Sequence, residues 1–205
     1  MLAYQKLLDS KADRGEIVGN ILWFPWQVFY YAAHASNPCV KTICEIGFGA
    51  GHSTLLYLSV NKDAVLYTFD IFELGPFQDA AVEFHKSVPH ARRWHRIKGD
   101  SQQTVPKFAS ENPGVKCDIV HVDGWHESPV VYNDIKNFRL LAHQETVVLI
   151  DDANEAPTQG DMQQAVDKGV TEEWECMDAR DETDERFASQ PIWPKRFCTT
   201  RYILA

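Results

Sequence analysis

The chain has 205 residues, a formal charge of −9 and a composition that is 44% hydrophobic, 24% charged and 12% aromatic. These values are typical of an ordinary globular protein of one domain, and the sequence contains no low-complexity tract or internal repeat. The acidic excess argues against a general nucleic-acid binder, because lysine and arginine carry most of the affinity for phosphate. We therefore expect a small-molecule partner and no nucleic acid.

The five cysteines show no spacing typical of a metal site, and most of them lie inside apolar runs. We predict buried reduced thiols and hence a reducing compartment. No signal-peptide pattern opens the chain, and its longest apolar stretch, residues 21–33, is too short and too interrupted to span a bilayer. The expected location is the cytoplasm, without attachment to a membrane.

Strand-like and helix-like segments alternate along most of the chain, which predicts a parallel sheet. In chain order they are a helix opened by Pro25, strand 40–47, helix 53–60, strand 64–71, helix 77–88, strand 94–99, helix 104–112, strand 117–123, helix 128–142 and strand 146–151. The last third differs, because a helix near 161–168 is followed by two strand-like runs, 172–178 and 197–205, with no helix between them. Such a pair is expected to be antiparallel and to lie at a sheet edge.

The predicted fold class is therefore α/β, a Rossmann-like doubly wound sheet that is mostly parallel and ends in an antiparallel strand pair. We divide the one predicted domain, residues 1–205, into three parts. These are an N-terminal helical segment at 1–40, a cofactor-binding core at 41–152 and a C-terminal helix with the strand pair at 153–205.

Acidic residues stand at or directly after the ends of all five predicted parallel strands. In doubly wound sheets, ligands bind at the carboxyl ends of the strands. A single acid in such a place often caps a helix or begins a turn. Acids at five strand ends favour a binding site, and they are Glu45, Asp70, Asp100, Asp123 and the pair Asp151 and Asp152.

The stretch CEIGFGAGHST, residues 44–54, places Gly47, Gly49 and Gly51 at alternate positions after the first of these strands. Glycines at this point permit a tight turn and let a ligand lie against backbone amides. Their spacing departs from the GxGxxG fingerprint of dinucleotide-binding proteins. Glu45 would repel a pyrophosphate but suits a ligand with an ammonium group, as in S-adenosylmethionine.

From Glu45 to Asp152 the sequence resembles the class I S-adenosylmethionine-dependent methyltransferases. Within this class it resembles the metal-dependent O-methyltransferases related to catechol O-methyltransferase and to the sugar and macrolide enzymes. The resemblance implies that the glycine loop surrounds the methionine part, that Asp70 binds the ribose hydroxyls and that the GDSQ segment, residues 99–102, binds adenine. The implied cofactor-binding residues are Glu45, Gly47, Phe48, Gly49, Gly51, His52, Ser53, Asp70, Ile71, Gly99, Asp100, Ser101, Gln102, Asp123 and Trp125.

The same resemblance implies a divalent metal at Asp123, Asp151 and Asp152, although the family usually has asparagine where this chain has Asp152. These residues follow two strands that we expect to be neighbours, and oxygen donors that converge on one point suit Mg²⁺ or another hard cation. The remaining coordination positions would bind two adjacent substrate oxygens. The alternative is that these aspartates form turns and cap a helix, with no metal.

Methyl transfer requires an acceptor oxygen that has lost its proton and is aimed at the methyl carbon. His126 occupies the position of a lysine in the catechol enzymes, and a neutral imidazole with a pKa near its usual value of about 6.5 could accept that proton. We therefore name His126 and Asp123 as catalytic candidates. The predicted function is metal-dependent O-methylation of a small molecule with adjacent oxygens, such as a vicinal diol, a catechol or a sugar.

Three alternatives stay open. A metal-independent small-molecule methyltransferase would use His126 alone as the base. A nicotinamide-dependent oxidoreductase would use the same sheet, and a noncatalytic binding protein would keep the frame without turnover. The sequence also leaves a homodimer open, and Trp193 in the loop at 179–195 is a candidate lid residue.

Overall fold

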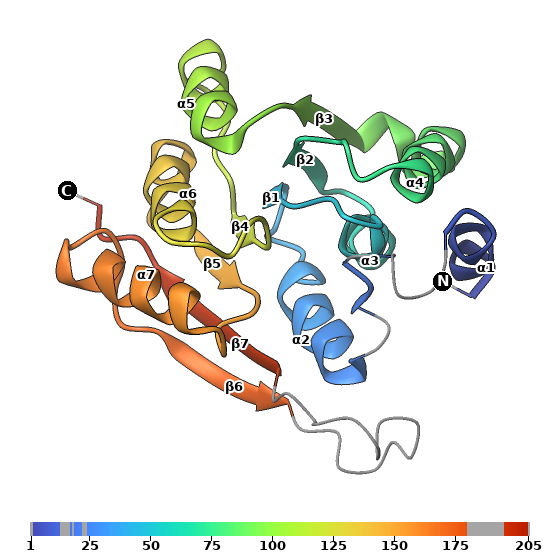
Figure 1. Ribbon diagram of the computed structural model, residues 1–205. Helices are drawn as coiled ribbons and strands as arrows, with labels where there is room; N and C mark the ends of the chain where they lie inside the picture. The colour runs from blue at the N-terminus through green and yellow to red at the C-terminus, as the bar shows by residue number, and fades with distance from the viewer. Residues whose placement is uncertain (1, 13–16, 18, 22–23, 180–194, 205) are drawn as a thin grey trace, which may run out of the picture.

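The computed structural model describes residues 2–12, 17, 19–21, 24–179 and 195–204, so Trp193 lies outside the described residues. Seven strands form one sheet in the order β3-β2-β1-β4-β5-β7-β6 (Figure 1). The first five are parallel, whereas β7 is antiparallel to both of its neighbours. The predicted fold class is confirmed, and the strands are β1 (Thr42–Ile46), β2 (Val65–Asp70), β3 (Trp94–Lys98), β4 (Ile119–Val122), β5 (Val147–Ile150), β6 (Glu175–Ala179) and β7 (Lys195–Arg201).

Helices cover both faces of the sheet (Figure 1). One face carries α1 (Leu2–Asp9), α2 (Pro25–Ala35), α3 (His52–Val60) and α4 (Pro76–Ser87), and the other carries α5 (Ser101–Glu111), α6 (Val130–Phe138) and α7 (Ala156–Asp167). A short 3-10 helix, η2 (Pro89–Arg93), leads into β3, and another, η3 (Arg139–Leu141), follows α6. The predicted helix at 128–142 is thus a shorter α-helix followed by a 3-10 turn.

The side chains of the central strands alternate between two hydrophobic clusters, one under each layer of helices. On β1, Ile43 belongs to the cluster with α2, α3 and α4, whereas Cys44 and Ile46 belong to the cluster with α5, α6 and α7. β4 is buried along its whole length. Because both faces are covered, these strands appear in the sequence as continuous apolar runs. The order of the sheet changes direction between β1 and β4, so that their carboxyl ends are where a ligand is expected to bind.

The cysteines differ from the prediction. Cys44 on β1 is bonded to Cys117, which precedes β4, and Cys176 on β6 is bonded to Cys198 on β7. Their Cα atoms lie 5.8 Å and 4.1 Å apart, while Cys39 is an exposed free thiol. The prediction of reduced thiols is wrong for these four bonded cysteines, because the folded sheet brings together cysteines that are 73 and 22 residues apart in the sequence. Disulfides are typical of oxidising compartments, so the cysteines give no support to a reducing cytoplasm. Among the described residues no helix has the length and apolar character needed to cross a membrane.

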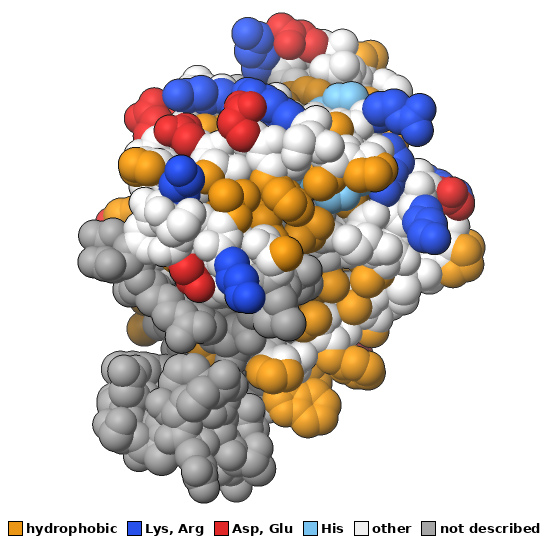
Figure 2. Space-filling model, turned by 90° about the vertical axis from the view of Figure 1, so that its right-hand side faces the viewer, with side chains coloured by type: hydrophobic (Ala, Val, Ile, Leu, Met, Phe, Trp, Pro, Cys, Tyr) orange, Lys and Arg blue, Asp and Glu red, His pale blue; other side chains and the backbone are white. Residues whose placement is uncertain are grey.

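The N-terminal segment lies against the glycine loop. The hydroxyl of Tyr4 on α1 donates to the carbonyl oxygen of Ala50 at 2.5 Å. A Cβ added to Gly19 would lie 3.3 Å from the Cα atom of Gly49. Figure 2 shows the side of the molecule that carries α1 and α4, where exposed hydrophobic side chains gather and charged ones lie mainly above them. The expected helical segment therefore packs on the loop predicted to hold the cofactor.

Candidate active site

The glycine loop after β1 meets the end of β4. Gly47 has a φ of +90°, and a Cβ added to it would lie 1.8 Å from the carbonyl oxygen of Asp123. The backbone N–H of Asp123 donates to the carbonyl of Ile46 at 3.0 Å. Any side chain at position 47 would therefore collide with backbone, and only glycine brings the two strand ends this close. The glycine loop and the acids that follow β4 lie at one edge of the sheet, as the sequence predicted.

Asp70, at the end of β2, holds the glycine loop through its carboxylate. Its Oδ2 accepts hydrogen bonds from the N–H groups of Phe48 at 2.7 Å and Gly49 at 3.4 Å, and its Oδ1 accepts from Phe72 at 2.5 Å. The side-chain amide of Gln78 donates to Oδ1 at 3.4 Å. Asp70, the residue predicted to bind ribose hydroxyls, is thus half-buried beside the glycine loop and holds the loop backbone in its conformation.

Glu45 lies beneath the loop, with no exposed surface. Its carboxylate accepts hydrogen bonds from the hydroxyl groups of Ser53, of Thr54 at 2.7 Å and of Thr68 at 3.1 Å. The Nδ1 atom of His121 on β4 lies 3.7 Å from the same carboxylate. Burial lowers the pKa of His121, but the neighbouring carboxylates outweigh it and the net pKa is raised. In this structure Glu45 holds the hydroxyl of Ser53 by a hydrogen bond. Its contact with an ammonium group of a ligand stays a prediction.

Two further predicted loop residues, Phe48 and His52, are also buried behind the loop. The ring of Phe48 stacks on Trp94 with centroids 5.2 Å apart. His52 is fully buried, and its Nε2 lies 2.9 Å from the side-chain oxygen of Gln5 on α1. Burial lowers the pKa of His52 to about 4, so this imidazole is neutral at physiological pH. Both side chains pack inside the protein, against Trp94 and Gln5, and stabilise the loop.

The predicted adenine segment begins α5 and is held by a residue that the sequence analysis missed. Asp100 is the N-cap, and its side chain accepts from the N–H of Gln102 at 2.9 Å. The hydroxyl of Ser101 and the amide of Gln102 both donate to Oδ1 of Asp134 on α6, at 2.7 and 2.6 Å. Burial raises the pKa of Asp134 to about 7, although these two hydrogen bonds act in the opposite direction. No motif spacing links residues 101 and 134, so only the packing of α5 on α6 reveals the contact.

Two predicted cofactor residues are large apolar side chains that stand exposed near this edge. Ile71 directly follows β2 and is 49% exposed, and Trp125 is the third residue after β4 and is 66% exposed. Single exposed apolar residues are common on protein surfaces. Here they follow two strands that end at the glycine loop, where an aromatic ring of a ligand could cover them.

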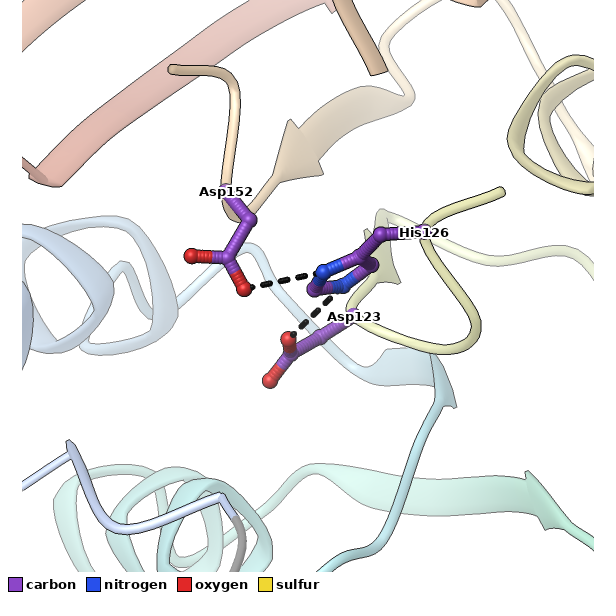
Figure 3. A group of neighbouring side chains, drawn as sticks. All are labelled: Asp123, His126 and Asp152. Atoms are coloured by element: carbon purple, nitrogen blue, oxygen red, sulfur yellow. Dashed lines mark ion pairs between the residues drawn. The ribbon is translucent and has the colours of Figure 1, made fainter. Parts of the chain in front are cut away.

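One group of three side chains that could hold a metal ion comes together among the described residues, and it consists of Asp123, His126 and Asp152. One ligand atom from each residue lies within 4.8 Å of the others. Figure 3 shows the imidazole between the two carboxylates. Its Nδ1 lies 3.0 Å from Oδ2 of Asp152, and its Nε2 lies 3.7 Å from Oδ1 of Asp123. The group joins the end of β4 to the end of β5.

Asp151, predicted as the third metal ligand, has other partners. It is 2% exposed, and its Oδ2 accepts a hydrogen bond from the side-chain amide of Gln27 on α2. Its Oδ1 accepts from the backbone N–H of Asp152 at 2.7 Å. The group of three therefore contains His126 rather than Asp151, whose role as a ligand stays a prediction.

The protonation state of His126 differs from the expectation of a neutral imidazole with an ordinary pKa. Burial lowers its pKa, but Asp123 and Asp152 favour the charged form more strongly, and the net pKa is about 10. In this structure His126 is an imidazolium at neutral pH. The charged imidazole lies between two carboxylates and balances their negative charge. A divalent cation bound there would supply this positive charge and would favour the neutral imidazole.

A model of the family described as "Methyltransferase domain" matches residues 44–153, more than half of the chain. No curated protein matches the chain.

Several solved structures resemble the fold over 98% of this chain. The O-methyltransferase from Bacillus cereus in complex with SAH has a TM-score of 0.74 at 12% identity, with 91% of its own chain covered. TomG from Streptomyces achromogenes, an O-methyltransferase involved in tomaymycin synthesis and solved with SAM, has a TM-score of 0.73 at 16% identity, with 90% of its own chain covered. CalS11, a TDP-rhamnose 3'-O-methyltransferase of calicheamicin biosynthesis, has a TM-score of 0.58 at 17% identity, with 91% of its own chain covered. At these identities the likeness shows the fold alone. The fold is that of the class I methyltransferases, and the chain belongs to the methyltransferase domain family.

Proposed function

We propose that the protein transfers a methyl group from S-adenosylmethionine to an oxygen of a small molecule, with the help of a divalent cation. The observation that carries the proposal is the contact between Gly47 and the backbone of Asp123. It brings the loop that would hold the methyl donor next to the group of three metal-binding side chains. A methyl donor and a cation-bound acceptor need this proximity, because in-line displacement depends on the position of both reactants.

The residues at the glycine loop fit S-adenosylmethionine. The loop has glycine at three positions with positive φ, and at Gly47 and Gly51 the backbone of Asp123 and the rings of Phe48 and Tyr4 occupy the space of a side chain, so these glycines set the path of the loop. The Asp70 carboxylate beside the loop can accept two hydrogen bonds from vicinal hydroxyls. To do so it would give up the hydrogen bonds that it accepts here from backbone N–H groups. Ile71 and Trp125 offer apolar surface to an adenine ring. Two of the similar structures carry SAH or SAM, which supports the same ligand here.

The donor set of Asp123, His126 and Asp152 fits a divalent cation. Two carboxylate oxygens and one imidazole nitrogen suit Mg²⁺ less well than oxygen alone, and they suit Mn²⁺, Fe²⁺ or Co²⁺. Three protein ligands leave positions for two adjacent oxygens of a substrate. We therefore extend the proposal to an acceptor with neighbouring oxygens, such as a vicinal diol, a catechol or a sugar.

When bound, S-adenosylmethionine supplies an electrophilic methyl group and the cation supplies the charge that lowers the pKa of an acceptor hydroxyl. The chain's own residues supply position and a proton acceptor. Asp123 and Asp152 fix the place of positive charge at the edge of the sheet, while the glycine loop fixes the donor beside it. A neutral imidazole has a single nitrogen lone pair, so His126 serves either as a ligand of the cation or as the base that accepts the proton of the acceptor hydroxyl, and not as both at once. A cation bound between the carboxylates would keep the imidazole neutral, as either role requires.

The test is transfer of a labelled methyl group from S-adenosylmethionine to a panel of catechols, sugars and vicinal diols. We expect product with at least one acceptor class, loss of activity in EDTA and recovery with Mn²⁺ or Mg²⁺. Activity that survives exhaustive chelation would overturn the metal and favour the alternative in which His126 acts alone. Calorimetric binding of SAH but not of reduced nicotinamide cofactor separates the proposal from an oxidoreductase. SAH binding without turnover on any acceptor would favour a noncatalytic role.

A further inference from the structure

We propose that Gln27, on helix α2, is a positioning residue for the cation site, acting on Asp152 through Asp151. The inference rests on the proposed function, because it concerns the same site. Gln27 lies outside residues 44–153, which the family model matches, and nothing in its sequence surroundings marks it. It joins the N-terminal part of the chain to the end of β5 across 124 residues of sequence.

Gln27 is held in one position by burial and by its partners. The side chain is 2% exposed and lies on the inner face of α2 with Tyr31, which is fully buried. The side-chain Nε2 donates to Oδ2 of Asp151 and lies 3.4 Å from the hydroxyl oxygen of Tyr31. Asp151 is itself 2% exposed, and a buried carboxylate oxygen without a hydrogen-bond donor costs free energy. Gln27 supplies such a donor without adding charge.

The bond from Gln27 fixes which way the Asp151 carboxylate faces. With Oδ2 bound to Gln27, Oδ1 points to the backbone N–H of Asp152 and accepts from it at 2.7 Å. Asp152 has a φ of +49°, a left-handed conformation that residues other than glycine rarely adopt. The carboxylate of Asp151 stabilises this conformation by satisfying the N–H that it presents.

The left-handed backbone at Asp152 aims the side chain at the cation site. From this position Oδ2 of Asp152 lies 3.0 Å from Nδ1 of His126 and belongs to the group of three. Without the donor from Gln27, the Asp151 carboxylate would be free to rotate, and its bond to the Asp152 amide would weaken. The cation would then lose one of its two well-placed carboxylates, while the glycine loop, which is held by Asp70, would keep its shape.

The chain offers a matched residue on the cofactor side. Gln78 is 1% exposed, and its side-chain amide donates to Oδ1 of Asp70 at 3.4 Å and to the carbonyl oxygen of Gly49 at 3.3 Å. Each of these glutamines thus donates to one functional aspartate, Gln27 to Asp151 and Gln78 to Asp70. Removal of each donor should affect a different ligand.

The experiment measures the binding of Mn²⁺ in the presence of saturating SAH, and the binding of SAH itself, by calorimetry and Mn²⁺ electron paramagnetic resonance. The variants are Gln27→Met, which keeps the length of the side chain without the donor, and Gln78→Met. For Gln27→Met we expect the Kd of Mn²⁺ to rise about tenfold and the Kd of SAH to stay within about twofold, following the usual free energy of one hydrogen bond to a charged group. For Gln78→Met we expect the reverse pattern.

Each outcome decides between the proposals. An unchanged Kd of Mn²⁺ in Gln27→Met, or a loss of SAH affinity as large as the loss of Mn²⁺ affinity, overturns the positioning role. If Gln27→Met does not fold, Gln27→Asn, which keeps the amide but draws it back by one methylene, is judged by the same split. Wild-type protein that binds SAH but no Mn²⁺ overturns the proposed cation site itself, and wild-type protein that does not bind SAH overturns the proposed methyl donor.

Discussion

Asp134 gives a prediction whose magnitude follows from the structure. This carboxyl is 1% exposed, and burial raises its pKa from the ordinary 3.8 to about 7. The native state therefore keeps the proton in a range where the unfolded chain has lost it. A rise of about three pH units, at about 1.4 kcal/mol for each, corresponds to about 4 kcal/mol of unfolding free energy. Because the pKa is raised on folding, this stability is fully present below about pH 4 and is lost as pH rises through about 7.

The substitution Asp134→Asn removes this titration and keeps an oxygen that can accept from Ser101 and Gln102. We expect the variant to be more stable than wild type above pH 7, by up to about 4 kcal/mol, and the advantage to vanish below about pH 4. Urea unfolding of both proteins at intervals from pH 4 to pH 8, followed by circular dichroism, measures the difference. Two stability curves that run parallel through this range would refute the reasoning, because they would show that Asp134 does not change its protonation on unfolding.

Three further predictions concern the site and the frame. Asp152→Ala should lower turnover at least about 100-fold, since it removes a carboxylate that we propose binds the cation, and should leave the calorimetric Kd of SAH within about twofold. Equal losses of turnover and of SAH affinity would contradict separate roles. Tyr4→Phe removes the donor to Ala50 and should weaken SAH binding roughly fivefold, as about 1 kcal/mol for one hydrogen bond implies, with unchanged binding as the contrary result. Reduction of the Cys176–Cys198 disulfide should lower the unfolding free energy by about 3 kcal/mol in urea titrations, because it closes a loop of the order of 20 residues, and an unchanged midpoint would exclude the bond from the folded protein in solution.

The fold could be predicted from the sequence because the sheet is buried on both faces. Apolar runs such as residues 117–123 and 146–151 have the length and composition of strands covered by helices, and the helices between them indicate parallel order. The two strand-like runs at 172–178 and 197–205, with no helix predicted between them, indicated the antiparallel pair of β6 and β7. The position of the site followed from the same reasoning, since acids after parallel strands must meet at one edge.

Contacts between distant residues could not be predicted in the same way. Nothing near Gln27 or Asp134 distinguishes them from ordinary helix residues, and their roles arise from the packing of α2 against β5 and of α6 against α5. The disulfides depend on which strands are neighbours, and the sequence leaves their pairing undetermined. The charge of His126 was misjudged for a similar reason, because its pKa depends on two carboxylates that converge only in the folded protein.

The proposed function requires a methyl donor in the glycine loop to lie beside a cation at the ends of β4 and β5. A crystal structure grown with SAH and Mn²⁺, with anomalous diffraction to locate the metal, measures both positions. We expect an anomalous peak within coordination distance, about 2.0 to 2.3 Å, of carboxylate oxygens from Asp123 and Asp152, with SAH along residues 47–51 and its sulfur toward the peak. Manganese bound elsewhere, or SAH bound away from the glycine loop, would contradict it.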